Sequence, residues 1–222
     1  MKLFLINCFF LTLFVLCNAV SANNFETKYS VSSSGIKIGE LNWYLKIIEN
    51  KYETKIVLKN SGIFSPLYKF DGNYTSNGII EDNKFKTKNY EQHWKTKKKI
   101  KIVKMSFGDG VVTINQSPAE KEFPRVNLSN LPSHFDPITS FMNILNGQES
   151  AYTIDGRRVY TMKRDFIKSD VITLQINKYK NIWADHKRND LKKIEFFISN
   201  EMFLPEKIKI YFKNRVFRLI KD

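Results

Sequence analysis

The chain has 222 residues, a formal net charge of +14, and 14% aromatic residues. Its two cysteines, Cys8 and Cys17, both lie in the first 22 residues, so the remainder has no disulfide, thiolate nucleophile or cysteine metal site. A charge this positive suits anionic partners such as lipid headgroups, lipopolysaccharide or acidic glycans. Lysines spread along nearly every predicted strand are equally typical of a solvated surface, so the charge alone selects no partner.

The first 22 residues have the pattern of a signal peptide. Lys2 precedes an apolar run from Leu3 to Cys17, and Val20-Ser21-Ala22 forms a small-residue cleavage site. The run is shorter than the roughly 20 apolar residues that a transmembrane helix needs. A lipoprotein anchored through Cys17 is the alternative, but it requires a small residue where Leu16 stands. We therefore expect cleavage after Ala22, export, and a single β-rich domain over residues 23–222. Export argues against nucleic acid as a partner.

Alternation of apolar and polar residues predicts strands along most of the exported chain. Residues 41–47 and 52–59 alternate in this way around Glu49-Asn50-Lys51, which predicts a hairpin. The later segments with this pattern are 100–107, 111–114, 159–164, 171–176, 193–198, 207–212 and 216–220. Turn chemistry between the strands predicts tight reversals at Asp71-Gly72, Asn77-Gly78, Gly108-Asp109-Gly110, Asp155-Gly156 and Lys213-Asn214.

One helix is expected, over residues 136–146. Asp136 suits its N-cap, Pro137 its first turn and Gly147 its end. Apolar residues fall on one face at Ile138, Phe141, Met142 and Leu145. A helix this short is marginal in isolation, so we expect it to lie on a sheet. The predicted fold class is all-β: a mainly antiparallel, strongly curved sheet or half-barrel with one short helix packed on it.

The order of several weak motifs resembles an exported bacterial family, domain of unknown function 3108. The motifs are Asp136-Pro137-Ile138-Thr139-Ser140-Phe141 with Ile144-Leu145, Asp155-Gly156-Arg157-Arg158-Val159-Tyr160, Ile194-Glu195-Phe196-Phe197-Ile198-Ser199, Leu204-Pro205 and Ile208-Lys209-Ile210. The similarity runs from about Phe25 to Ile220 and includes residues 36–40. Family members often carry tryptophan where Phe197 stands, and residues 84–104 are unusually rich in lysine. The resemblance implies a β-rich, half-barrel envelope protein of Gram-negative bacteria, located in the periplasm, with no settled activity.

Catalytic constellations are weak in this sequence. His93, His134 and His186 lie far apart and match no metal-ligand spacing, so we expect neither a metal nor a cofactor. His134, two residues before Asp136, is the best candidate for acid–base chemistry, although a loop histidine is the simpler interpretation. No nucleophile elbow, P-loop or dinucleotide fingerprint occurs. We therefore do not expect an enzyme and rank a hydrolase below the alternatives.

Two groups of side chains are candidates for binding. Arg157 and Arg158 follow a turn and point to opposite faces of a strand, so one of them suits an anionic headgroup. Pairing with nearby carboxylates is the simpler interpretation of these arginines. Trp43 and Phe141 are the apolar candidates for the ligand-facing side. Trp94 with Lys97, Lys98 and Lys99 suits an anionic membrane surface, or else forms an exposed hairpin tip that protects a sheet edge.

We therefore expect a non-catalytic envelope protein that holds a lipid or another amphipathic or apolar ligand on the concave face of its sheet. The alternative is a scaffold or partner-binding protein whose concave face is filled by its own side chains. A continuous apolar cavity of several hundred cubic ångströms favours the first interpretation, whereas a solid core with an exposed apolar patch favours the second.

Overall fold

The structure is a computed structural model that describes residues 22–61, 69–131, 133–168, 171–184, 190–198 and 204–222. The predicted signal peptide lies outside this part of the chain, apart from Ala22, which begins the first strand. His186 and the Ser199 of the family motif also lie outside the described residues. None of the described helices is both long enough and apolar enough to span a bilayer.

The described chain consists of strands with one short helix. The strands are β1 (Ala22–Ser33), β2 (Ile36–Ile48), β3 (Lys51–Asn60), β4 (Phe70–Glu81), β5 (Lys84–Thr96), β6 (Ile100–Gly108), β7 (Val111–Ser117), β8 (His134–Phe135), β9 (Ser150–Ile154), β10 (Arg158–Lys168), β11 (Val171–Asn181), β12 (Leu191–Phe197), β13 (Lys207–Phe212) and β14 (Arg215–Lys221). The helix, α2, is Pro137–Leu145. The predicted fold class is thus confirmed.

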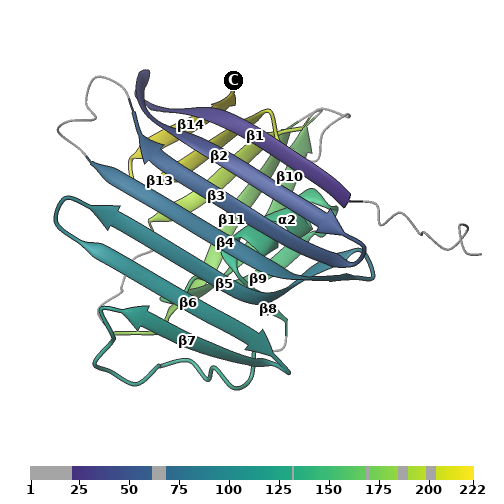
Figure 1. The fold of residues 1–222 in the computed structure, drawn as a ribbon, viewed down its shortest axis with the longest axis vertical. Coiled ribbons are helices and arrows are strands. Elements are labelled where there is room, and N and C mark those ends of the chain that lie inside the picture. The colour runs from purple at the N-terminus through teal and green to yellow at the C-terminus, as the bar shows by residue number, and fades with distance from the viewer. Residues whose placement is uncertain (1–21, 62–68, 132, 169–170, 185–189, 199–203) are drawn as a thin grey trace, which may run out of the picture.

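All the strands belong to one curved sheet (Figure 1). Its order is β7-β6-β5-β4-β3-β2-β1-β14-β13-β12-β11-β10-β9-β8, in which chain neighbours pair throughout and β1 joins β14. Neighbours run antiparallel, except that β8 pairs parallel to β9. The sheet curls so that its two edge strands, β7 and β8, face each other, but they do not pair in the described sheet. We call the gap between them the seam.

The β2–β3 hairpin shows why these residues form a two-faced sheet. Trp43 and Leu45 are buried on the concave face, while the alternate residues Tyr44 and Lys46 point outward. The turn at Glu49-Asn50 gives Glu49 a positive φ of 53°. The hairpin predicted from the sequence is confirmed, with Leu41 opposite Leu58 and Ile47 opposite Tyr52.

Two predicted turns are wrong. Asp71-Gly72 and Asn77-Gly78 both lie inside β4, and neither reverses the chain. A Cβ atom on Gly72 would lie 3.1 Å from the ring of Trp94, and one on Gly78 would lie 1.9 Å from the carbonyl oxygen of Lys86. These glycines therefore allow close approach to β5 rather than a positive φ. The predicted reversals at Asp109-Gly110, Asp155-Gly156 and Lys213-Asn214 are present.

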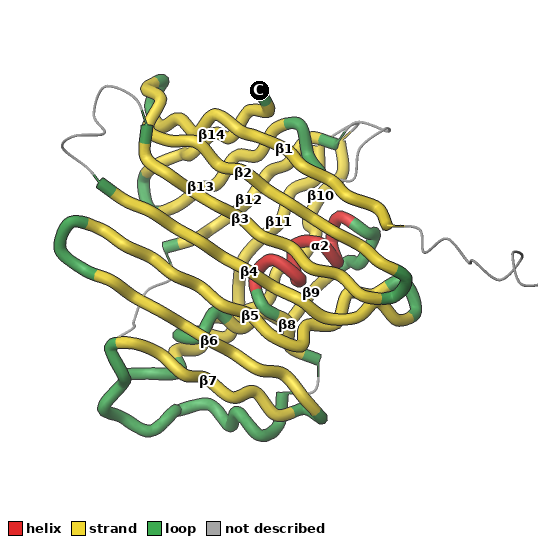
Figure 2. Tube along the Cα trace, viewed as in Figure 1, coloured by secondary structure: helices red, strands yellow, loops and turns green. Residues whose placement is uncertain are grey.

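Helix α2 lies on the concave face, enclosed by the curved sheet (Figure 2). Its N-cap is Asp136, whose carboxylate accepts hydrogen bonds from the backbone N–H groups of Ile138 and Thr139. Gly147, with φ of 99°, follows the C-cap residue Asn146. Seven of its nine residues are buried. The predicted helix, with its caps, is confirmed.

The core lies between α2 and the sheet. Phe141 packs against Trp43 and Phe196, with ring centroids 5.7 and 5.0 Å apart. The indole N–H of Trp43 donates a hydrogen bond of 2.9 Å to Thr54 Oγ1. The concave face beneath α2 is therefore occupied by the protein's own side chains.

Beyond β7, the chain crosses the seam and is held at several points. The backbone N–H of Val112 donates to Leu128, that of Leu131 donates to Gly110, and that of Arg125 donates to Ile182. At the same end of the sheet as Ile182, the β9–β10 turn reaches β6: a Cβ atom on Gly156 would lie 2.4 Å from Val103 Cγ1. The seam is thus closed at this end by packing.

Candidate functional site

At its other end, the seam contains a cavity of about 520 Å³, which we call the seam cavity. It lies among the β6–β7 turn, the segment before α2, the strand β9, and the start of β5. Its apolar lining comes from Phe107, Val112, Leu131 and Phe135. Lys84 and Lys86 also line it, and both are exposed. Asp109 lines it as well, so one cavity combines an apolar wall with two cationic groups and one acidic group.

Behind the seam cavity lies a buried polar cluster centred on Asp136. The carboxylate oxygen Oδ2 accepts hydrogen bonds from Ser76, Thr87 and Thr139 hydroxyls at 2.8, 2.7 and 2.5 Å. Burial raises the pKa of Asp136, while the hydroxyl donors act in the opposite direction. Because Ser76 lies on β4, Thr87 on β5 and Thr139 on α2, this one carboxylate joins the helix to two strands.

Further polar contacts fix the helix in the same place. The Tyr52 hydroxyl lies 2.7 Å from Thr139 Oγ1. Asn143 accepts a hydrogen bond of 2.8 Å from the backbone N–H of Phe85 and donates one of 2.9 Å to the Phe85 carbonyl. Asn143 also lines the seam cavity. These hydrogen bonds therefore fix part of the cavity wall between a helix and a strand.

His134 lies in the wall of the seam cavity beside Tyr152, with ring centroids 5.6 Å apart. Its Nδ1 atom is buried and has no hydrogen-bond partner in the described part of the protein. Burial lowers the pKa of His134, so the neutral ring is favoured near pH 7. A neutral imidazole has one donor and one acceptor nitrogen, so the ring adds a polar but uncharged group to the cavity wall. Within the described residues, no group of three or more His, Cys, Asp or Glu side chains is placed to hold a metal ion.

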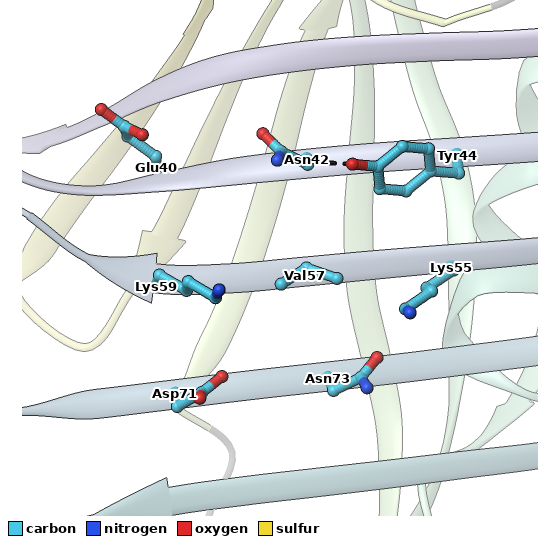
Figure 3. A pocket seen from close by; sticks show the side chains of 8 residues that line it. All are labelled: Glu40, Asn42, Tyr44, Lys55, Val57, Lys59, Asp71 and Asn73. Carbon is cyan, nitrogen blue, oxygen red and sulfur yellow. Dashed lines mark hydrogen bonds between the residues drawn. The ribbon is translucent and has the colours of Figure 1, made fainter.

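A second hollow, of about 560 Å³, lies on the outer face of β2, β3 and β4 (Figure 3). Asn42, Val57 and Asn73 stand side by side across these strands, and the short Val57 side chain leaves space between longer neighbours. Charged residues of both signs surround it: Glu40, Lys55, Lys59 and Asp71. The hollow is polar and, apart from Val57, its lining offers no aliphatic side chain to an apolar ligand.

Comparison with known families decides the relationship of this chain. The sequence model of the family "Protein of unknown function (DUF3108)" matches residues 28–217. The chain belongs to this family. The predicted resemblance is therefore confirmed, and the family description names no activity.

Other comparisons add little to the assignment of this DUF3108 protein. A search of curated proteins found no match. Among solved structures, it is similar to a β-barrel-like protein of the domain of unknown function DUF1849 from Brucella abortus. The two share 13% sequence identity and a TM-score of 0.48, over 92% of this chain and 98% of that chain.

The structure of the DUF3108 protein places the sequence-predicted ligand residues in two separate regions. Trp43 and Phe141 contact each other in the core, with 3% and 8% of their surfaces exposed. Arg157 and Arg158 follow the Asp155-Gly156 turn. The guanidinium of Arg158 donates two hydrogen bonds to Asp155 Oδ2, at 3.2 and 2.9 Å. Arg158 is thus paired with a carboxylate of its own turn.

The residues predicted to contact a membrane are also divided. Lys97, Lys98 and Lys99 form the exposed tip of the β5–β6 hairpin. Trp94 lies opposite Gly72 on the concave face and stacks on Phe70, with ring centroids 5.7 Å apart and planes 8° from parallel. The indole therefore lies on the concave face, whereas the three lysines lie at the tip of the hairpin.

Proposed function

We propose that this DUF3108 protein is an exported, non-catalytic binding protein of the Gram-negative periplasm that holds an amphipathic or apolar ligand in its seam cavity. The observation that carries this proposal is the cavity of about 520 Å³ with Phe107, Val112 and Leu131 in its wall. Pockets for small molecules commonly measure about 300 to 1,000 Å³ and combine apolar walls with a few polar groups.

The lining suggests how such a ligand would lie. Its apolar part would contact Phe107, Val112 and Leu131, while an anionic head would lie near Lys84 and Lys86. Lys86 already pairs with Glu81 at 2.5 Å, so Lys84 is the lysine better placed to bind a ligand.

Titration with a fluorescent fatty acid, cis-parinaric acid, tests the proposal. We expect saturable binding by the wild-type protein and at least a tenfold loss in Val112→Trp. Val112 is buried on the concave side of β7 and lines the cavity, so the larger ring takes up space that the ligand needs. The matched control is Thr113→Trp, which places the same ring on the exposed outer side of the β6–β7 hairpin. Equal affinity in the two variants would place the ligand elsewhere.

A second comparison tests the cationic part of the cavity. Lys84→Gln is expected to weaken binding of cis-parinaric acid while leaving binding of the corresponding alcohol unchanged, because only the acid carries a charge for Lys84 to bind. Native mass spectrometry of the protein purified from its own envelope then identifies the ligand. The same measurement reports whether the mature chain lacks its first 22 residues, as export with cleavage after Ala22 requires.

The alternative function is an envelope scaffold or partner-binding protein with a filled core. The packing of Phe141 between Trp43 and Phe196 favours it, because α2 fills the concave face that the sequence-based hypothesis left for a ligand. A chain that is purified without ligand, and that rejects both the acid and the alcohol probe, would support this alternative.

A further inference from the structure

The two ends of the sheet carry opposite charges at their turns. Because neighbouring strands are antiparallel, the β1–β2, β5–β6 and β13–β14 turns share one end, which we call the basic end. The β2–β3, β4–β5 and β6–β7 turns share the opposite end. Figure 2 shows the β1–β2 and β5–β6 turns on the left and the β2–β3 and β4–β5 turns on the right.

The turn residues of these two sets of turns differ in sign. The β9–β10 turn also lies at the basic end, and its acid, Asp155, pairs with Arg158. The β1–β2, β5–β6 and β13–β14 turns are Ser34-Gly35, Lys97-Lys98-Lys99 and Lys213-Asn214. The turns at the opposite end are Glu49-Asn50, Asp82-Asn83 and Asp109-Gly110. The basic end thus has four lysines and no acid in these turns, and the opposite end has three acids and no lysine. A cavity at the basic end is lined by Lys59, Lys69, Lys95 and Lys97, of which Lys97 also belongs to the β5–β6 turn.

Exposed apolar side chains accompany the basic turns. Ile36 begins β2, Ile100 begins β6 and Phe212 ends β13, so each lies beside one of these three turns. Their exposed fractions are 42%, 55% and 36%. At the opposite end, the exposed Val111 belongs to the lining of the seam cavity.

We propose that the basic end docks on an anionic lipid bilayer. Lysines near a bilayer surface are attracted to anionic headgroups, and apolar side chains beside them enter the headgroup region. The acidic turns at the opposite end are repelled by the same surface, so the charge distribution selects one orientation. In this orientation the seam cavity, which includes Asp109 and Gly110, opens away from the bilayer.

Three side chains of the basic end contribute less to the proposed contact with the bilayer. Lys37 pairs with Glu40 at 2.8 Å and Lys213 pairs with Asp190 at 3.7 Å, so both share their charge with a carboxylate. Trp94 points to the concave face and stacks on Phe70, so it is not a membrane anchor. The β5–β6 turn has three consecutive exposed lysines with the exposed Ile100 beside them, so it combines positive charge with apolar surface and carries the proposed contact.

Vesicle co-sedimentation of the full mature chain tests the charge contribution. We expect binding to vesicles of phosphatidylcholine mixed with phosphatidylglycerol, little binding to pure phosphatidylcholine, and a decrease as salt is raised. Changing Lys97, Lys98 and Lys99 together to Gln is expected to weaken binding by about 100-fold. The matched control changes the exposed Lys46, Lys51 and Lys88 to Gln, which removes the same charge away from the basic end.

The apolar contribution is tested by a single substitution. Ile100→Ser is expected to weaken binding by about tenfold, whereas Ile220→Ser, at a residue 49% exposed on β14, leaves it unchanged. Absence of binding to the phosphatidylglycerol vesicles, or equal losses in the two lysine triples, would overturn the proposal. Fatty-acid binding in solution is measured separately, so failure of the membrane contact is distinguishable from failure of the seam cavity as a ligand site.

Discussion

Thr87 Oγ1 donates a hydrogen bond of 2.7 Å to Asp136 Oδ2, and Thr87 also lines the seam cavity. The wall of the cavity and the N-cap of α2 therefore share one hydrogen bond. A ligand that displaces Thr87 would disturb the helix, while a ligand that leaves it in place finds a preformed wall. The site is for this reason closer to a rigid pocket than to a flexible cleft.

Asp136→Ala should unfold the protein at markedly lower urea concentration. The change removes an N-cap and leaves the Ser76, Thr87 and Thr139 hydroxyls without their common acceptor. We expect a loss of about 3 to 5 kcal/mol in the free energy of unfolding. Asp136→Asn, which keeps one acceptor oxygen and is an equally good N-cap, should lose less. Equal stability of the Ala variant and the wild type would show that the cluster contributes nothing.

The raised pKa of Asp136 also predicts a pH dependence. The folded state binds this proton more tightly than the unfolded chain, whose aspartate titrates near pH 3.9. The group's contribution to stability is therefore present at low pH and is lost as pH rises through the raised folded value. Urea unfolding of wild type and Asp136→Asn across this range measures it. The wild-type advantage should shrink as pH increases, and a constant difference would contradict the raised pKa.

His134 should give the free energy of unfolding a pH dependence opposite to that of Asp136. Its pKa is lowered by burial, so the folded state disfavours the proton that the unfolded chain accepts near pH 6.5. The stability contribution is complete above that pH and is lost as pH falls through the lowered value. Compared with His134→Gln, the wild type should lose more stability on acidification from neutral pH. Parallel pH profiles for the two proteins would remove this assignment.

Phe141→Ala distinguishes a core residue from a ligand contact. Because Phe141 packs between Trp43 and Phe196, its truncation should cost about 3 to 5 kcal/mol of unfolding free energy. At a urea concentration that leaves both proteins folded, its affinity for cis-parinaric acid should equal that of the wild type. If Phe141→Ala has normal stability but binds cis-parinaric acid more weakly, the ligand contacts Phe141 on the concave face, and the seam cavity is not the binding site.

The sequence predicted the helix and the hairpins well because local chemistry determines them. Asp136, Pro137 and Gly147 mark both ends of α2, and the β2–β3 alternation is regular. It did not predict β5, because a bulge opposite Asn77 and Gly78 breaks the alternation and its buried face includes the polar Thr87. The glycines of β4 were misread because a residue that permits a turn equally permits close packing.

The candidate site was harder to predict because segments far apart in the chain form it. The seam cavity combines the β6–β7 turn, β8, β9 and β5, which meet only when the sheet curls. The nearest sequence signal was His134, two residues before Asp136, the sequence-based candidate for acid–base chemistry, which lies in the wall of this cavity. The buried cluster of Ser76, Thr87 and Thr139 gave no signal, because hydroxyl side chains are usually taken as surface residues.

Gly156, in the β9–β10 turn, should not tolerate a side chain, for two separate reasons. It has φ of 82°, and an added Cβ atom would lie 2.4 Å from Val103 Cγ1. Gly156→Ala should therefore lower the free energy of unfolding by about 2 to 3 kcal/mol, as measured by urea denaturation. Gly108→Ala is the matched control, because its Cβ atom would meet nothing within 4 Å and its φ is not positive.

The double variant Gly156→Ala with Val103→Ala separates the two causes. It removes the clash and keeps the backbone strain, at the cost of a cavity at Val103. If Gly156→Ala is as stable as Gly108→Ala, the turn does not pack on β6, and the seam is not closed at that end.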